Sequence, residues 1–113
     1  MRDQILALVT HHCDTIRQEA SEIAELMSHG AASLDANRAA LESKVHKLKG
    51  GSGTIGFVEI SSVALQMELV LREDKCRPLD PDEVERLQQE NARLQAMVRD
   101  ITPDQSTLYV RFV

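Results

Sequence analysis

The residues best suited to chemistry lie in one short segment, where His46 is followed at helical spacing by Lys49, Gly50 and Gly53. The segment also continues an apolar stripe, which at about 100° per residue forms one face of a helix. His46 falls off that face and shares its side of the helix with the two glycines and the lysine. An exposed imidazole beside a cation, on a surface with few side chains, is suited to receive a phosphoryl group from another protein and to pass it on. The stripe comprises Leu41, Val45, Leu48, Ser52 and Ile55.

The pattern H-x-L-K-G-x-S, with Gly56 ten positions after His46, resembles the histidine-containing phosphotransfer (HPt) family. The motif covers Val45 to Gly56, and the surrounding helical pattern is compatible from about Ile5 to Ile101. The resemblance implies a phosphorelay carrier in two-component signalling. Its partners would be response-regulator receiver domains and a sensor or hybrid histidine kinase.

The same resemblance assigns roles to single residues. His46 would be the phosphoacceptor, Lys49 would stabilise the phosphoryl charge, and Gly50 would let the loops of the receiver come close. Glu42 and Gly53 share the His46 side of the helix, so we expect both to contact the partner as well. The chain would be a carrier without ATP-dependent kinase activity, with no cofactor or metal of its own. Mg²⁺ would be bound by the partner receiver domain.

Composition and charge restrict the class of protein. A chain of 113 residues with 42% hydrophobic and 3% aromatic residues favours a single helical domain. The net charge is −5 with scattered lysines and arginines, which argues against nucleic acid as a partner. No apolar run approaches ~18 residues, which argues against a membrane span. Cys13 and Cys76 read as free thiols, so we expect a cytoplasmic protein. We also expect a monomer, because the apolar seam of the last predicted helix is best explained as intramolecular core.

The apolar spacing and the turn residues predict four helices. The first runs from about Ile5 to near Gly30, and the second is capped by Ser33 or Asp35 and ends between Gly51 and Gly56. The third begins near Phe57, and the fourth begins at Asp80-Pro81 and ends at Thr102-Pro103. We therefore predict an all-α, antiparallel up-down-up-down four-helix bundle over residues 1–103, followed by an extended apolar tail over residues 104–113.

Two local patterns have other interpretations. Gly51 to Gly56 spells G-x-G-x-x-G, but a dinucleotide-binding loop needs a preceding strand, and the residues before Gly51 have a helical period. His11-His12-Cys13-Asp14 contains metal-ligand types, but adjacent helical side chains point about 100° apart and cannot converge on one ion. We expect His12 or Cys13 beside the core and His11 in water.

Two other functions remain open from the sequence. The chain could be an HPt-like module that binds receivers without being phosphorylated. It could also be a structural helical scaffold or dimer built on the apolar seam between Val84 and Ile101. The second alternative does not explain why an exposed helix face should contain several glycines, each of which costs roughly 1 kcal/mol relative to alanine.

Overall fold

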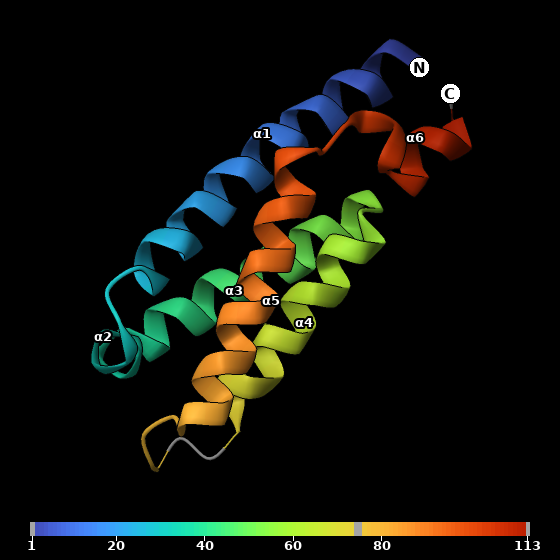
Figure 1. Cartoon of the computed structure of the whole chain (residues 1–113). Coiled ribbons are helices and arrows are strands. Elements are labelled where there is room, and N and C mark those ends of the chain that lie inside the picture. The colour runs from blue at the N-terminus through green and yellow to red at the C-terminus, as the bar shows by residue number, and fades with distance from the viewer. Residues whose placement is uncertain (1, 74–75, 113) are drawn as a thin grey trace.

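The computed structural model describes residues 2–73 and 76–112, and all regular structure within these residues is helical. The all-α class predicted from the sequence is therefore confirmed. Four of the helices are long and lie side by side (Figure 1). The elements are α1 (Arg2–Met27), α2 (Ala31–Ala36), α3 (Arg38–Ile55), α4 (Val58–Arg72), α5 (Pro81–Arg99), the 3₁₀ helix η1 (Pro103–Gln105) and α6 (Thr107–Phe112).

The core lies between the four long helices. α3 packs on α4, α4 on α5, and α1 on both α3 and α5, so the helices close a ring around one apolar cluster. The buried side chains of α1 alternate by four and three positions, as expected for a single stripe facing a core. They are Val9, Cys13, Ile16, Ala20, Ile23 and Met27. In the described part of the chain, no helix combines the length and apolarity needed to cross a membrane.

The connection between α1 and α3 differs from the prediction. Ser33 and Asp35 do not cap the second long helix, because both lie inside the separate short helix α2. The helix α3 begins after Asn37, whose side chain makes no capping hydrogen bond. Asp35 instead accepts a hydrogen bond at 2.9 Å from the backbone N–H of Leu79, at the other end of the α4–α5 connection. Its short polar side chain thus serves tertiary packing.

The end of α3 is set by Gly56, within the predicted interval. Gly56 has φ +91°, a left-handed conformation that glycine adopts without a Cβ penalty. The N–H of Phe57 donates to the carbonyl of Ser52 at 2.8 Å, and that of Gly56 to Gly53 at 3.1 Å, which is the Schellman pattern. The helix α4 then starts at Val58, as expected. Since α3 is continuous up to Ile55, the G-x-G-x-x-G segment is helical except for its last residue, Gly56, and it is not a nucleotide loop.

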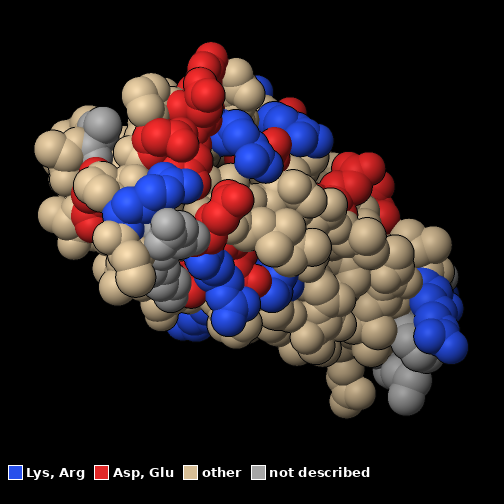
Figure 2. All heavy atoms as spheres, turned by 90° about the horizontal axis from the view of Figure 1, so that it is seen from below, with Lys and Arg blue, Asp and Glu red and all other residues tan. Residues whose placement is uncertain are grey.

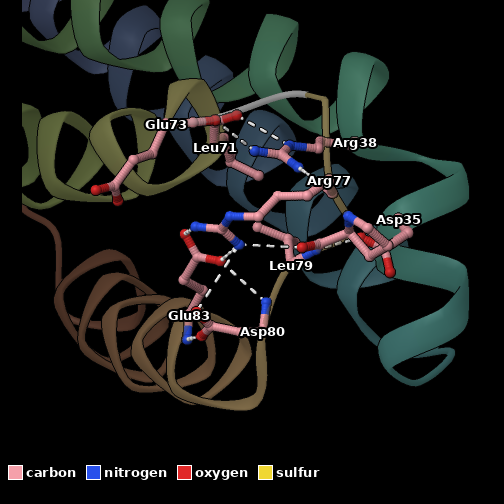
Figure 3. A network of polar contacts seen from close by, with 9 residues as sticks. Asp35, Arg38, Leu71, Glu73, Arg77, Leu79, Asp80 and Glu83 are labelled. Carbon is pink, nitrogen blue, oxygen red and sulfur yellow. Dashed lines mark hydrogen bonds and ion pairs between the residues drawn. The ribbon is translucent and has the colours of Figure 1, made fainter.

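One arginine ties α3 to the end of α4. Arg38 donates to the carbonyls of Leu71 at 3.0 Å, Glu73 at 2.8 Å and Arg77 at 3.0 Å (Figure 3). Carbonyls at the C-terminus of a helix have no partner within the helix, and a cation there also opposes the negative end of the helix dipole. Arg38 therefore fixes the relative position of α3 and α4 at the end away from the chain termini.

A second set of polar contacts starts α5. Asp80 accepts from the N–H of Glu83 at 2.8 Å, and the Glu83 carboxylate accepts from the N–H of Asp80 at 2.9 Å, so the pair is a capping box (Figure 3). Arg77 binds the same carboxylate through two nitrogens, at 2.6 and 3.1 Å. These hydrogen bonds lower the pKa of Glu83 to about 2. The predicted start of the last long helix at Asp80-Pro81 is confirmed.

The tail is helical, so the prediction of an extended segment is wrong. Ser106 is buried and acts at the start of α6, where its hydroxyl accepts from the N–H of Tyr109 at 3.2 Å. The same hydroxyl donates to the carbonyl of Ile55 at 2.5 Å, and the N–H of Thr107 donates to Gly56 at 3.0 Å. The tail thus lies against the end of α3. Half-buried Leu108 and Tyr109 pack against the core, whereas Val110 is 66% exposed.

The remaining predicted tail residues lie at the edge of the described structure. The backbone of Phe112 belongs to α6, but its side chain and all of Val113 lie outside the described residues.

Figure 2 shows that Lys and Arg are interspersed with Asp and Glu over the end of the molecule that holds the α4–α5 connection. Between this end and the chain termini, the face shown is largely uncharged.

Candidate functional site

His46 lies on the outer side of α3, as the apolar spacing predicted. Val45 and Leu48 on either side of it are fully buried, and they hold this part of the helix against the core. The His46 side chain is 64% exposed. Among the other histidines named above, His11 is exposed and His12 is half-buried, and Cys13 is buried, as expected.

A buried carboxylate on the neighbouring helix holds the imidazole. Glu68 on α4 is only 2% exposed, and its Oε2 lies 2.5 Å from Nδ1 of His46. Its other oxygen, Oε1, accepts a hydrogen bond from Nζ of Lys49 at 2.6 Å. The Nη1 atom of Arg72 lies 3.8 Å from the same oxygen. One carboxylate therefore brings together the histidine and two cations from α3 and α4.

The ionisation of Glu68 decides which nitrogen of His46 can react. Burial by itself would raise the pKa of the Glu68 carboxyl, but the hydrogen bonds from Lys49 and His46 outweigh burial, and the pKa lies below its ordinary value. Glu68 is thus ionised at neutral pH and can only accept. Nδ1 must then donate the proton, which leaves the lone pair of the neutral ring on Nε2. That lone pair is the group a nucleophile needs.

In the structure, Lys49 and Glu42 each form an ion pair with another charged residue of the same cluster. The ammonium of Lys49 lies on Glu68, although an ammonium has three donors and one contact does not exhaust them. Oε1 of Glu42 lies 3.4 Å from Nε of Arg72, so this carboxylate forms an ion pair within the site. Contact of Glu42 with a partner protein remains a prediction.

The two glycines of the predicted contact surface have different surroundings. A Cβ at Gly50 would meet no atom within 4 Å, so this position is open, as clearance for a partner requires. A Cβ at Gly53 would lie 3.0 Å from Oγ of Ser61 on α4. Ser61 also donates to the carbonyl of Lys49 at 3.0 Å. Gly53 therefore allows close packing of α3 on α4, a role that the sequence analysis did not include.

Sequence analysis missed two charged residues of this site, Glu68 and Arg72, and two exposed apolar residues that neighbour them on α4. Glu68 and Arg72 are described above, and Leu65 and Leu69 are large apolar side chains that are 38% and 53% exposed. At spacings of three and four, the four residues share one side of α4. A signal was present, since Glu68 follows the buried Met67 directly and lies beside an apolar stripe. An acid in that position is rarely buried without a charged partner.

Comparison with known proteins identifies the family of the chain. A family model of the Hpt domain matches residues 4–97, which is nearly the whole chain and reaches into all four long helices. Neither the curated proteins nor the solved structures compared with the chain gave a match. From the extent of the family match, this chain belongs to the Hpt domain family, whose members are carriers in the phosphotransfer reactions of two-component signalling.

Proposed function

We propose that His46 accepts a phosphoryl group from the aspartyl phosphate of a receiver domain and passes it to a response regulator. The observation that carries this proposal is the contact of Nδ1 with the buried, ionised Glu68 at 2.5 Å. This contact supports a reactive Nε2 on a side chain that is 64% exposed to a partner. We also propose that the four long helices follow one another in an antiparallel up-down-up-down order.

The transfer itself needs little more than this arrangement. The lone pair of Nε2 forms a bond to phosphorus while the bond from phosphorus to the aspartyl oxygen breaks, and the aspartate leaves as a carboxylate. The proton stays on Nδ1, so the phosphorylated ring carries a positive charge. Glu68 lies against that charge and stabilises it. The same step in reverse transfers the phosphoryl group from His46 to the aspartate of a second receiver.

The surroundings of His46 fit a protein partner. Open space at Gly50 permits close approach, and the exposed Leu65 and Leu69 on α4 provide apolar area for contact. The receiver would supply Mg²⁺. ATP-dependent kinase activity is not part of the proposed role. We expect the donor receiver to be attached to a sensor or hybrid histidine kinase.

The direct test is transfer of labelled phosphoryl from a phosphorylated receiver domain. Wild-type protein should gain an acid-labile, base-stable label, as expected for a phosphoramidate. His46→Gln should gain none, while the control His11→Gln, at an exposed position of α1, should label like wild type. Helical circular dichroism should be the same for all three proteins. Receiver binding without any label on wild type would favour the non-phosphorylated module instead, and undiminished label on His46→Gln would move the acceptor elsewhere.

A further inference from the structure

A hollow lies on the surface between the start of α4, the end of α5 and the tail, at the end of the molecule that holds both chain termini (Figure 1). Its volume is about 730 Å³. Ligand pockets typically have roughly 300–1,000 Å³, so the hollow is large enough for a ligand. Gly56 lines it and follows His46 by ten positions, which corresponds to about 15 Å along α3 at a rise of roughly 1.5 Å per residue. The hollow is therefore separate from the site around His46.

The base of the hollow is apolar. Phe57 and Ile60, at the start of α4, line it and are only 2% and 3% exposed, and Met97 of α5 is half-buried beside them. Val58 also lines the hollow and is 61% exposed, so the apolar surface continues outwards at the mouth. Apolar area of this kind favours contact with an apolar group of a ligand.

The tail forms one wall of the hollow and is held there by hydrogen bonds. Nε2 of Gln105 donates to the backbone carbonyl of Asp100 at 3.1 Å, and the N–H of Thr107 donates to the carbonyl of Gly56 at 3.0 Å. All four of these residues line the hollow. The walls are thus in place before a ligand arrives, so little free energy is lost in ordering them on binding.

The charged side chains of the hollow are both negative. Glu59 and Asp100 line it from α4 and from the end of α5, and no Lys or Arg is among the described residues that do so. The start of α4 and the end of α5 contribute helix-dipole charges of opposite sign, so the two carboxylates dominate. Arg99 lies 4.0 Å from the Asp100 carboxylate, but both side chains are largely exposed, so this ion pair is weak.

The combination of an apolar base and two carboxylates defines the ligand that is complementary to the hollow. Such a ligand has an apolar group next to a cation. An Arg or Lys side chain next to an apolar residue has this chemistry, because its stem can lie on the apolar base while its charged head reaches the carboxylates. The exposed Val58 at the mouth favours a chain that continues beyond the hollow over a small molecule enclosed by it.

We propose that this hollow binds a segment of a partner protein in which an Arg or Lys adjoins an apolar residue. Glu59 and Asp100 bind the cation, and Phe57, Ile60 and Met97 contact the apolar side chain. The proposal goes beyond the proposed function, because this contact does not involve a phosphoryl group on His46.

The first test is a titration of the ¹⁵N-labelled wild-type protein with the acetylated and amidated tripeptide Leu-Arg-Leu. The amide resonances of Glu59, Met97 and Thr107 should shift and reach saturation, whereas that of Gly50, beside His46, should not move. The matched peptide with citrulline in place of arginine has the same shape without the charge. It should bind about threefold more weakly or worse, the loss expected for a partly exposed ion pair. No shift at the hollow with millimolar peptide, or equal affinity for the two peptides, would overturn the proposal.

Substitutions in the hollow give the second test. Glu59→Gln and Asp100→Asn should each weaken peptide binding by about threefold, and Glu85→Gln, at an exposed position of α5, should have no effect. Ala96→Lys places a competing ammonium in the hollow and should weaken binding by about tenfold. Its control is Ala92→Lys, one turn earlier on the exposed side of α5. Circular dichroism should show equal helix content in all variants. Equal binding to the two lysine variants would mean that the peptide binds elsewhere.

Two further measurements separate this proposal from its alternatives. Phenethylammonium has an apolar group and a cation but no peptide chain, and it should bind more weakly than the tripeptide. Tighter binding of phenethylammonium would make the hollow a site for a small organic cation and would contradict a partner segment. His46→Gln should bind the tripeptide like wild type, since the hollow is separate from the imidazole. Failure of phosphoryl transfer to His46 would therefore leave this binding unchanged, whereas loss of binding in His46→Gln would contradict a separate site.

Discussion

His46 and Glu68 form a pair across the α3–α4 contact, with Nδ1 and Oε2 only 2.5 Å apart although one side chain is largely exposed and the other is buried. Twenty-two positions separate the two residues in the chain. Glu68 is buried in the protein, whereas His46 is exposed to solvent. The pair therefore gives a surface nucleophile a fixed orientation, which a solvated histidine on a helix would not have.

The negative charge of Glu68 should affect the rate of phosphoryl transfer more than the size of its side chain does. Glu68→Gln keeps the size of the side chain but can donate as well as accept, so it no longer forces the proton onto Nδ1. We expect transfer from a phosphorylated receiver to slow by roughly tenfold or more. The ¹⁵N shifts of the His46 ring should show a mixture of tautomers. Glu85→Gln, at an exposed position of α5, is the control. Normal rates together with an unchanged tautomer would show that Glu68 serves packing alone.

Gly50 and Gly53 should respond differently to the same substitution. Gly50→Ala should raise the free energy of unfolding by up to about 1 kcal/mol, because alanine is the better helix former and its Cβ meets open space. At Gly53 this gain should be reduced or reversed, since Oγ of Ser61 would have to move. Urea unfolding of both variants checks this comparison. Equal gains at both positions would mean that α4 has room to adjust.

A larger side chain at Gly50 tests docking. Gly50→Leu should fold with wild-type stability or better and yet bind a receiver domain more weakly, because leucine projects into the space beside His46. Affinity can be measured by calorimetry with an unphosphorylated receiver, with Gly50→Ala as the milder variant. Wild-type affinity of the leucine variant would place the receiver on another face.

Acid should destabilise the protein through Glu83. Its folded pKa of about 2 lies below the ordinary value of 4.5, so between these values the unfolded state binds more protons. The contribution of Glu83 to stability is complete above pH 4.5 and is lost as the pH falls towards 2. Glu68, with its lowered pKa, acts in the same direction. Glu83→Gln should flatten this dependence in thermal melts from pH 6 to 2, and an unchanged slope would argue against the Arg77 contact.

The tail should contribute stability rather than chemistry. Ser106→Ala removes the hydrogen bonds to Ile55 and from Tyr109, and it should lower the free energy of unfolding by about 1–2 kcal/mol. Deletion of residues 104–113 should lower the melting temperature further, while the folded fraction still transfers phosphoryl at the wild-type rate. Ser21→Ala, at an exposed position of α1, is the control. A slower rate at unchanged stability would instead assign the tail a role in partner binding.

Local signals explain what the sequence could predict. Gly56 and Asp80-Pro81 set helix boundaries through backbone conformation and capping, which depend on near neighbours, and both boundaries agree with the structure. The exposed position of His46 follows from helical spacing in the same way. The tail is an informative failure, because the β-forming residues Tyr109 and Val110 favoured an extended chain. The capping serine at position 106 outweighed that preference.

Tertiary register explains what the sequence could not predict. The partner of His46 is decided by which turn of α4 lies opposite it, and no spacing within α3 contains that information. The hydrogen bonds from Arg38 to the carbonyls of Leu71 and Glu73 could not be predicted for the same reason, since they depend on where α4 ends relative to α3. The break at Asn37 also has no side-chain cap that could have indicated it.

The tight turn at Gly56 has a consequence for how the site is assembled. Because α3 and α4 are joined by so short a connection, both halves of the His46–Glu68 pair belong to a single helical hairpin. Contacts of low sequence separation form at little entropic cost. The core, in contrast, is complete only when α1 and α5, from the two ends of the chain, have docked. The reactive geometry is thus encoded locally while global stability is not. Substitutions in α1 or α5 can therefore change how much protein is folded without changing the chemistry of each folded molecule.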